Sequence, residues 1–171
     1  MIPAEVLAWL EQHGYGQVTG AHPVAGGCIN NGTPLETSSG RSLFLTTNPA
    51  APEDMFEREL EGLQALRVPG APVIPEAYLS GAIFLLLEDL APAPHARDYW
   101  PEFGRRLAGL HAHTSPRFGF PQDNYLGLTP QPNPWTEDGY EFFATQRLLY
   151  QARLARRQGL LSREDLQRAE K

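Results

Sequence analysis

The sequence contains almost no lysine. Of its 14 basic residues 13 are arginine, and the single lysine is Lys171, the last residue. No interior lysine is therefore available to pair with a phosphate, to form a Schiff base or to act as a general base. Cysteine is equally scarce, because Cys28 is the only one in the chain. A single cysteine excludes an internal disulfide and a cysteine-based zinc site.

An excess of positive charge and a long apolar run are also missing. The formal net charge is −6, which argues against a nucleic-acid partner and against a basic helix on a membrane surface. The longest apolar run, residues 82–87, is far too short to cross a bilayer. The first twelve residues include Glu5 and Glu11 but no basic residue, unlike a signal peptide. These features predict a cytoplasmic protein without a nucleic-acid or membrane partner.

The composition is that of a globular protein, with 42% apolar and 20% charged residues in a chain of 171. This length suits one domain, or a small lobe and part of a second one. Turn residues and period-two alternation predict short strands between residues 17 and 48, including strands at 33–37 and 41–47. Two further strands are predicted at 77–79 and 82–87. The second is apolar on both faces and should therefore be a buried central strand.

Helices are predicted before, between and after these strands. Residues 1–13 read as a short helix with Pro3 in its first turn and Gly14 after its end. Residues 53–67 carry an apolar stripe at helical spacing. Beyond Pro92 and Pro94 the pattern predicts helices over 100–110 and 139–158, separated by an irregular segment at 118–134. In the closing segment 162–171, Ser162 with Asp165 suggests a capping box at a helix start.

Several short motifs occur in a recognisable order along the chain. They are Gly27-Cys28-Ile29-Asn30, Phe44-Leu45-Thr46-Thr47-Asn48, Met55-Phe56-Glu57-Arg58-Glu59-Leu60, Leu87-Glu88-Asp89-Leu90, Leu107-Ala108-Gly109-Leu110-His111, and a long signature from Phe118-Gly119-Phe120 to Trp135. Together they resemble the fructosamine-3-kinase (ketosamine-3-kinase) family over nearly the whole chain. The resemblance implies an α+β, protein-kinase-like fold. Its N-terminal nucleotide-binding lobe, residues 1–90, would hold a five-stranded antiparallel sheet and one helix, and residues 91–171 would be the first helices of the substrate lobe.

The resemblance also assigns candidate cofactor-binding residues. A glycine loop that covers the nucleotide phosphates would contain Gly26, Gly27, Cys28 and Gly32, although a plain hairpin turn is the alternative. The residues Glu88, Asp89 and Leu90 would be the hinge beside the adenine, or simply the polar end of a buried strand. Glu59 would be the helix carboxylate that pairs with a strand lysine, or a solvent-facing glutamate.

Two departures from the family pattern bear on activity. The position of the strand lysine is Thr46, whose hydroxyl carries no charge, and only Arg41 or Arg58 offers a substitute cation. Phosphoryl transfer also needs a carboxylate base and metal-binding Asp and Asn residues. None of the aspartates in the sequence has the family's His-Gly-Asp or Asp-Pro context, so no catalytic residue and no metal ligand is assigned.

Three other groups of residues have less specific interpretations. His111 and His113 are two apart at a helix end, which favours capping or packing over a shared metal. Cys28 is either an inert small residue or an oxidisable one. Trp135, Phe142 and Phe143 would pack in a core or line a sugar pocket.

The predicted parent function is ATP-dependent phosphorylation of a fructosamine or ketosamine hydroxyl, with ATP and Mg²⁺ as cofactors and a small-molecule or glycated-amine substrate. The chain alone is predicted to be inactive. The alternative is a non-catalytic, pseudokinase-like module that binds nucleotide or a protein partner. A third possibility keeps the fold but changes the substrate, as in aminoglycoside or choline kinases, which the signature through Trp135 disfavours. The apolar helix stripes predict a homodimer or a swapped assembly.

Overall fold

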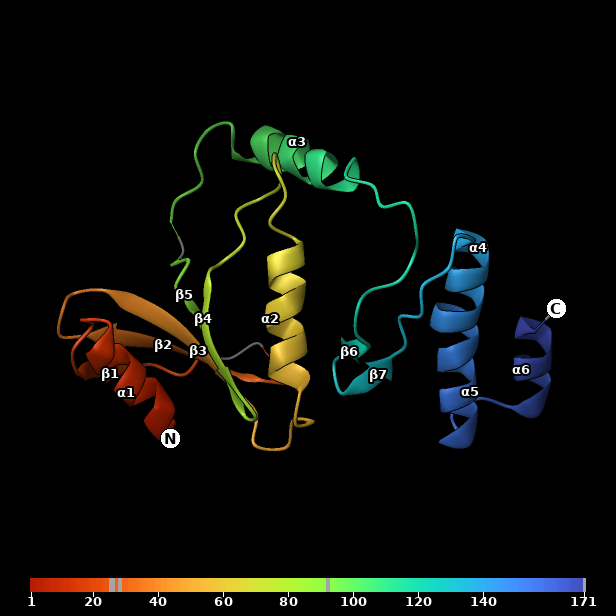
Figure 1. The fold of residues 1–171 in the computed structure, drawn as a ribbon, viewed down its shortest axis with the longest axis horizontal. Coiled ribbons are helices and arrows are strands. Elements are labelled where there is room, and N and C mark those ends of the chain that lie inside the picture. Colours follow the sequence, from red (N-terminus) through yellow and green to blue (C-terminus); the bar gives the residue numbers. More distant parts are fainter. Residues whose placement is uncertain (25–26, 28, 92, 171) are drawn as a thin grey trace. The chain divides into compact units, whose positions relative to one another are not determined.

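A computed structural model describes residues 1–24, 27, 29–91 and 93–170 (Figure 1). Its internal contacts divide the chain into two compact units, Met1–His113 and Thr114–Lys171. The predicted lobes, residues 1–90 and 91–171, have a different limit and remain a prediction. Among the described residues, no helix has both the length and the apolar character needed to cross a membrane.

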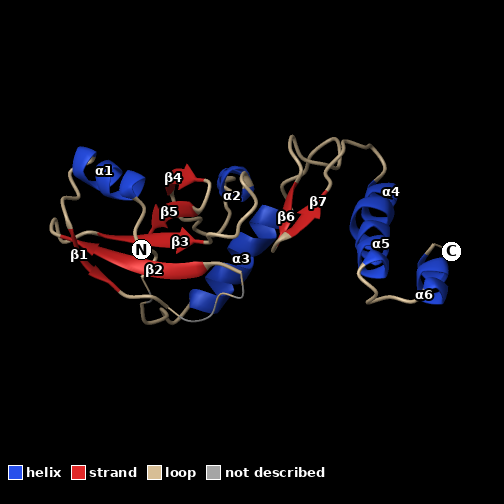
Figure 2. Ribbon diagram, turned by 90° about the horizontal axis from the view of Figure 1, so that it is seen from below, coloured by secondary structure: helices blue, strands red, loops and turns tan. Residues whose placement is uncertain are grey.

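The first unit is built on a five-stranded antiparallel sheet (Figure 2). Its strands are β1 (Val18–Ala21), β2 (Asn31–Thr37), β3 (Ser42–Thr47), β4 (Ala77–Gly81) and β5 (Phe84–Glu88), in the spatial order β1-β2-β3-β5-β4. β5 lies between β3 and β4, and all its residues from Phe84 to Leu87 are buried. The apolar run therefore forms an internal strand, as predicted, because both of its faces are covered.

Two helices pack against opposite faces of this sheet. From α1 (Ala4–Gln12), Val6 and Leu10 join a core with Leu43, Leu45 and Leu86. The residues between these in the strands point the other way. There Leu85 and Leu87 of β5 pack with Phe56 of α2 (Met55–Ala65). The alternation in β3 and β5 thus separates a core under α1 from a core under α2.

Helix α3 (Tyr99–His111) completes the first unit. Gly109 allows a close approach, since a Cβ there would lie 2.9 Å from the carbonyl oxygen of Gly70. None of the residues of α3 is buried, and Trp100 is 67% exposed. The predicted apolar stripe therefore forms a helix but stays largely uncovered in this unit.

In the second unit, residues 118–134 are not wholly irregular, which corrects the prediction. β6 (Asn124–Leu126) pairs with β7 (Thr129–Gln131) in a short antiparallel hairpin. Gly127 follows β6 with φ of 62°, a left-handed conformation that glycine adopts without strain. Pro130 lies within β7, and a proline argues against a strand when only the sequence is considered.

The predicted helix at 139–158 is present as one helical stretch with an unexpected middle. It consists of α4 (Gly139–Phe142), a π-helical segment η1 (Phe143–Leu149) and α5 (Tyr150–Arg157). α6 (Arg163–Ala169) follows, and the hydroxyl of Ser162 accepts a hydrogen bond from the backbone N–H of Asp165. This confirms Ser162 as the N-cap of the last helix.

Candidate nucleotide-binding site

Thr46 lies in the middle of the sheet, on the face that α2 covers. It pairs with Gly32 of β2 on one side and Leu85 of β5 on the other. Residues directly opposite each other in an antiparallel pair point to the same face, and Leu85 packs against α2. The side chain of Thr46, in a residue only 8% exposed, therefore points to the face from which α2 presents Glu59.

Glu59 lies on the sheet-facing side of α2. It is three residues after the buried Phe56 and four before Leu63, which packs against the same core, and residues at these spacings share a helix face. Desolvation by this burial raises the pKa of the Glu59 carboxyl, and no charged neighbour contributes to the shift. Within the described residues Glu59 has no cationic partner. Glu59 is thus partly buried rather than fully solvent-facing, and its role as the carboxylate partner of a strand lysine stays a prediction.

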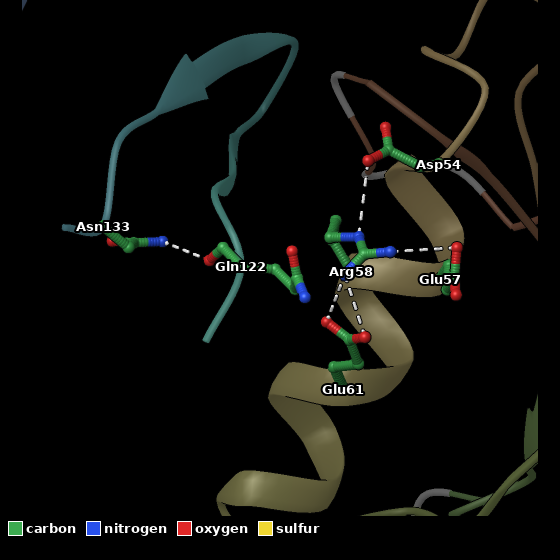
Figure 3. Close-up of polar contacts among 6 residues, drawn as sticks. All are labelled: Asp54, Glu57, Arg58, Glu61, Gln122 and Asn133. Carbon is green, nitrogen blue, oxygen red and sulfur yellow. Dashed lines mark hydrogen bonds and ion pairs between the residues drawn. The ribbon is translucent and has the colours of Figure 1, made fainter. Parts of the chain in front are cut away.

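Arg58, the nearest arginine in sequence, is already engaged by three carboxylates, one just before α2 and two within it (Figure 3). Its guanidinium nitrogens lie 3.3 Å from Asp54, 3.0 Å from Glu57 and 2.7 Å from Glu61. Desolvation acts to lower the pKa of Arg58, but the three carboxylates outweigh it and raise the pKa. Arg58 is thus held as a cation within α2.

Arg41, the other substitute cation considered, lies beside the end of α1. It donates a 2.7 Å hydrogen bond to the carbonyl oxygen of Gly14, and its guanidinium carbon lies 3.6 Å from the centre of the Tyr15 ring. Both contacts keep its charge with residues that follow α1. Neither arginine thus replaces the missing lysine in this conformation.

The turn between β1 and β2 contains the predicted glycine loop. Gly26 and Cys28 lie outside the described residues. At Gly27 a Cβ would come within 2.3 Å of the carbonyl oxygen of Asn30, and at Gly32 it would meet the Phe44 ring at 2.6 Å. The contact at Gly27 is with backbone and leaves no room for a side chain, whereas at Gly32 the Phe44 ring would have to move. Bare backbone of this kind is what a phosphate-covering loop requires.

Asn48 anchors this turn, a role that the sequence analysis missed. The residue is 7% exposed. Its side-chain amide donates to the carbonyl oxygen of Ile29 at 3.1 Å and to Oδ1 of Asn30 at 3.2 Å, and its own oxygen accepts from the N–H of Ala50. Asn48 therefore ties the glycine turn to the end of β3. Its place two residues after Thr46 in the family motif was the available signal.

The predicted hinge follows β5. The backbone N–H of Glu88 donates to the carbonyl oxygen of Glu76 at 2.7 Å, and the Glu88 carboxylate accepts from the N–H of Glu76. Glu88 is thus tied to the segment that enters β4, and its N–H is not free for a ligand. Within the described part of the chain, the backbone groups of Asp89 and Leu90 form no hydrogen bond with each other and none with a distant segment. These two remain the candidates for contact with an adenine edge.

In the second unit, residues of the family signature form a hydrogen-bonded cluster around Asn133. Asn133 is 4% exposed. Its amide donates to the carbonyl oxygen of Gln122 at 3.0 Å (Figure 3), its N–H donates to Asp123 at 2.7 Å, and Arg147 donates to its side-chain oxygen. Arg147 also donates to the carbonyl oxygen of Pro132 at 2.7 Å. Asp123 and Asn133 therefore have a structural role here.

The aromatic residues at the end of the signature and shortly after it are less buried than core residues. Trp135 is 44% and Phe143 57% exposed, so the core interpretation is wrong for both within this unit. The Phe142 ring lies 6.4 Å from that of Phe118 and 4.5 Å from the guanidinium of Arg147. Among the described residues, no three His, Cys, Asp or Glu side chains come together as a metal site.

The antiparallel sheet with α2 on one face defines an α+β, protein-kinase-like fold. Solved structures support this fold. A putative fructosamine-3-kinase from Thermobifida fusca is 26% identical, with a TM-score of 0.80, and the match covers 95% of this chain and 57% of that protein's chain. One from Haemophilus somnus is also 26% identical, with a TM-score of 0.77, covering 92% of this chain and 55% of its own.

The family model described as fructosamine kinase matches residues 1–170, and the chain belongs to this family. A probable ketoamine kinase from Synechocystis is 40% identical over 139 residues, which are 78% of this chain and 47% of that protein. A chloroplastic protein-ribulosamine 3-kinase from Arabidopsis thaliana is 37% identical over 83% of this chain and 45% of its own length. The chain thus spans about half the length of the curated relatives it matches.

Proposed function

We propose that this chain forms the nucleotide-binding part of a kinase that transfers the γ-phosphoryl group of ATP to a hydroxyl of a ketosamine. The family membership supports the reaction class, and relatives are named as ketoamine and protein-ribulosamine kinases. The observation that carries the proposal is the pairing of Gly32, Thr46 and Leu85 across β2, β3 and β5. It aligns the glycine turn, the family's lysine position and the α2 face on one side of the sheet.

In this proposal the residues of the chain bind and orient the nucleotide. The backbone around Gly27 and Gly32 lies along the phosphates, held in place by Asn48. The backbone groups of Asp89 and Leu90, which form no long-range backbone hydrogen bond with the described residues, contact the adenine edge. ATP supplies the phosphoryl group, and Mg²⁺ neutralises its charge during transfer. Residues 1–171 contain no aspartate in the family's catalytic context, so we expect the chain alone to bind nucleotide without transferring phosphate.

The second candidate function is that of a nucleotide-binding or interaction module without catalysis. The observation that favours it is Thr46, together with a Glu59 that has no cation to pair with among the described residues. A kinase lysine normally bridges this carboxylate and the nucleotide phosphates. Without it, the phosphates lose a charge-assisted contact, and nucleotide binding becomes weaker.

The test compares two proteins with a fructosyl-amine and Mg-ATP. The 171-residue chain should form no sugar phosphate above background; if its gene encodes a longer product, that product should form it. Phosphorylation by the 171-residue chain would show that the proposed division of roles is wrong. No phosphorylation by the complete gene product, with ATP still bound, would favour the non-catalytic module. The predicted dimer or swapped assembly is measured in the same samples by light scattering.

A further inference from the structure

The second unit contains a cavity that the proposed function does not use. Its volume is about 840 Å³, and it is lined by Phe118, Glu137, Asp138, Gly139, Tyr140 and Phe143. This volume is within the range of small-molecule sites, roughly 300–1,000 Å³. The cavity lies at the start of α4, and Phe143 is also the first residue of the π-helical segment. Such segments occur frequently at functional sites.

The aromatic wall of the cavity is held by the backbone. Phe118 and Thr136 exchange two backbone hydrogen bonds, of 2.8 and 2.9 Å. The Phe118 ring lies against Gly139, where a Cβ would come within 2.5 Å of it. Tyr140 and Phe143 are 92% and 57% exposed, so their rings are accessible to a ligand. The cavity therefore presents aromatic faces, which attract cations through their quadrupole.

The charges at the cavity have one sign. Glu137 and Asp138 are carboxylates, and none of the six lining residues is basic. The nearby Arg117 lies 5.0 Å from the Trp135 ring, and Arg147 is engaged with Pro132 and Asn133. A helix start attracts anions, but Asp138 already accepts hydrogen bonds from the N–H groups of Tyr140 and Glu141. An anionic ligand would meet two carboxylates, whereas a cation meets complementary charge.

We propose that this cavity binds an alkylammonium ion, with the cationic head near Glu137 and the apolar stem on the rings of Phe118, Tyr140 and Phe143. A ketosamine is an amine that carries a sugar, and an aliphatic amine of this kind is protonated at neutral pH. The cavity would then hold the amine-bearing side of the substrate. This last assignment depends on the proposed function, but the binding of an alkylammonium ion does not.

The experiment titrates the 171-residue chain with n-butylammonium and with 1-butanol, a neutral molecule with the same carbon chain, by calorimetry. We expect saturable binding of the cation and binding of the alcohol that is at least fivefold weaker. Tyr140→Leu keeps an apolar side chain but removes the ring. It should weaken binding of the cation by about two- to fivefold. Glu137→Gln removes one negative charge and should weaken binding of the cation by up to about fivefold.

Glu164→Gln is the control, because it removes an exposed carboxylate on α6 that does not line the cavity. It should leave cation binding unchanged. Equal binding of the alcohol, no saturable binding, or wild-type affinity in both cavity variants would overturn the proposal. Because butylammonium has no sugar hydroxyl and needs no nucleotide, these outcomes are independent of ATP binding. Competition by a fructosyl-butylamine then tests the link to the proposed function separately.

Discussion

Replacing Thr46 by lysine should create the ion pair that α2 and β3 now lack. Thr46 points to the face of the sheet covered by α2, and Glu59 lies on the sheet-facing side of that helix. Burial raises the pKa of Glu59, and no charged group among the described residues compensates for it. An ammonium group placed from position 46 would relieve this cost by pairing with the carboxylate. We therefore expect Thr46→Lys and Glu59 to be energetically coupled.

The size of this coupling follows from the burial of Glu59. Exposed ion pairs contribute about 0.2–1 kcal/mol, whereas removing one partner of a fully buried pair costs about 3–5 kcal/mol. Glu59 is only partly buried, so we expect a coupling free energy of about 1–2 kcal/mol, reduced from the buried case by solvent screening. For a chain of this length, each 1 kcal/mol corresponds to a shift in Tm of about 2–4 °C.

A double-mutant cycle measures this term by urea unfolding of the wild type, Thr46→Lys, Glu59→Gln and the double variant. Since Thr46 is nearly buried, the lysine stem has its own packing cost, which Thr46→Met reproduces without charge. The coupling should be present at pH 7 and should vanish once Glu59 is protonated. A coupling within about 0.3 kcal/mol of zero at pH 7, below the usual limit of additivity, would refute the geometry argued for Thr46 and Glu59.

Three further predictions concern single side chains. Because the pKa of Glu59 is raised on folding, the wild type loses stability as pH rises through that pKa. Glu59→Gln should therefore be more stable than the wild type at pH 7, by less than about 1 kcal/mol, and should gain nothing near pH 3. Equal stability of the two proteins at every pH from 3 to 7, measured by unfolding, would contradict this. Asn48→Asp keeps the acceptor for the N–H of Ala50 but loses the donors to Ile29 and Asn30. It should lower the free energy of unfolding by about 1–3 kcal/mol and weaken ATP binding. An unchanged ATP affinity in calorimetry would argue against the anchoring role. Arg147→Met should lower the free energy of unfolding by about 2–4 kcal/mol, because two charged hydrogen bonds are lost. Chemical denaturation measures this cost. The control is Arg157→Met at an exposed position, which should be nearly neutral.

The sequence predicts most elements of the first unit because its signals are local. The apolar run in β5, the stripe on α2 and the turn residues around the glycine loop each fix one element. The face to which Thr46 points could not be predicted, because it depends on the register of β3 against β2 and β5. Register is set by pairing between distant segments.

The second unit was harder to predict for specific reasons. Pro130 masked strand β7, and the hairpin depends on the left-handed Gly127. The π-helical segment leaves no periodic signal that separates it from an α-helix over residues 143–149. Asn133 looks like an ordinary loop polar residue, and its buried position becomes evident only once Asp123, Gln122 and Arg147 are folded around it.

The central claim is that the first unit carries the nucleotide site of a ketosamine kinase, and calorimetric titration with Mg-ATP tests it most directly. The wild-type chain should bind Mg-ATP weakly. Thr46→Lys should bind it about ten- to a hundredfold more tightly, because a charged hydrogen bond to the phosphates contributes about 1.5–3 kcal/mol, and Thr46→Met should not improve it. If neither the wild type nor Thr46→Lys binds Mg-ATP at millimolar concentrations while both remain folded, this assignment of the site is wrong.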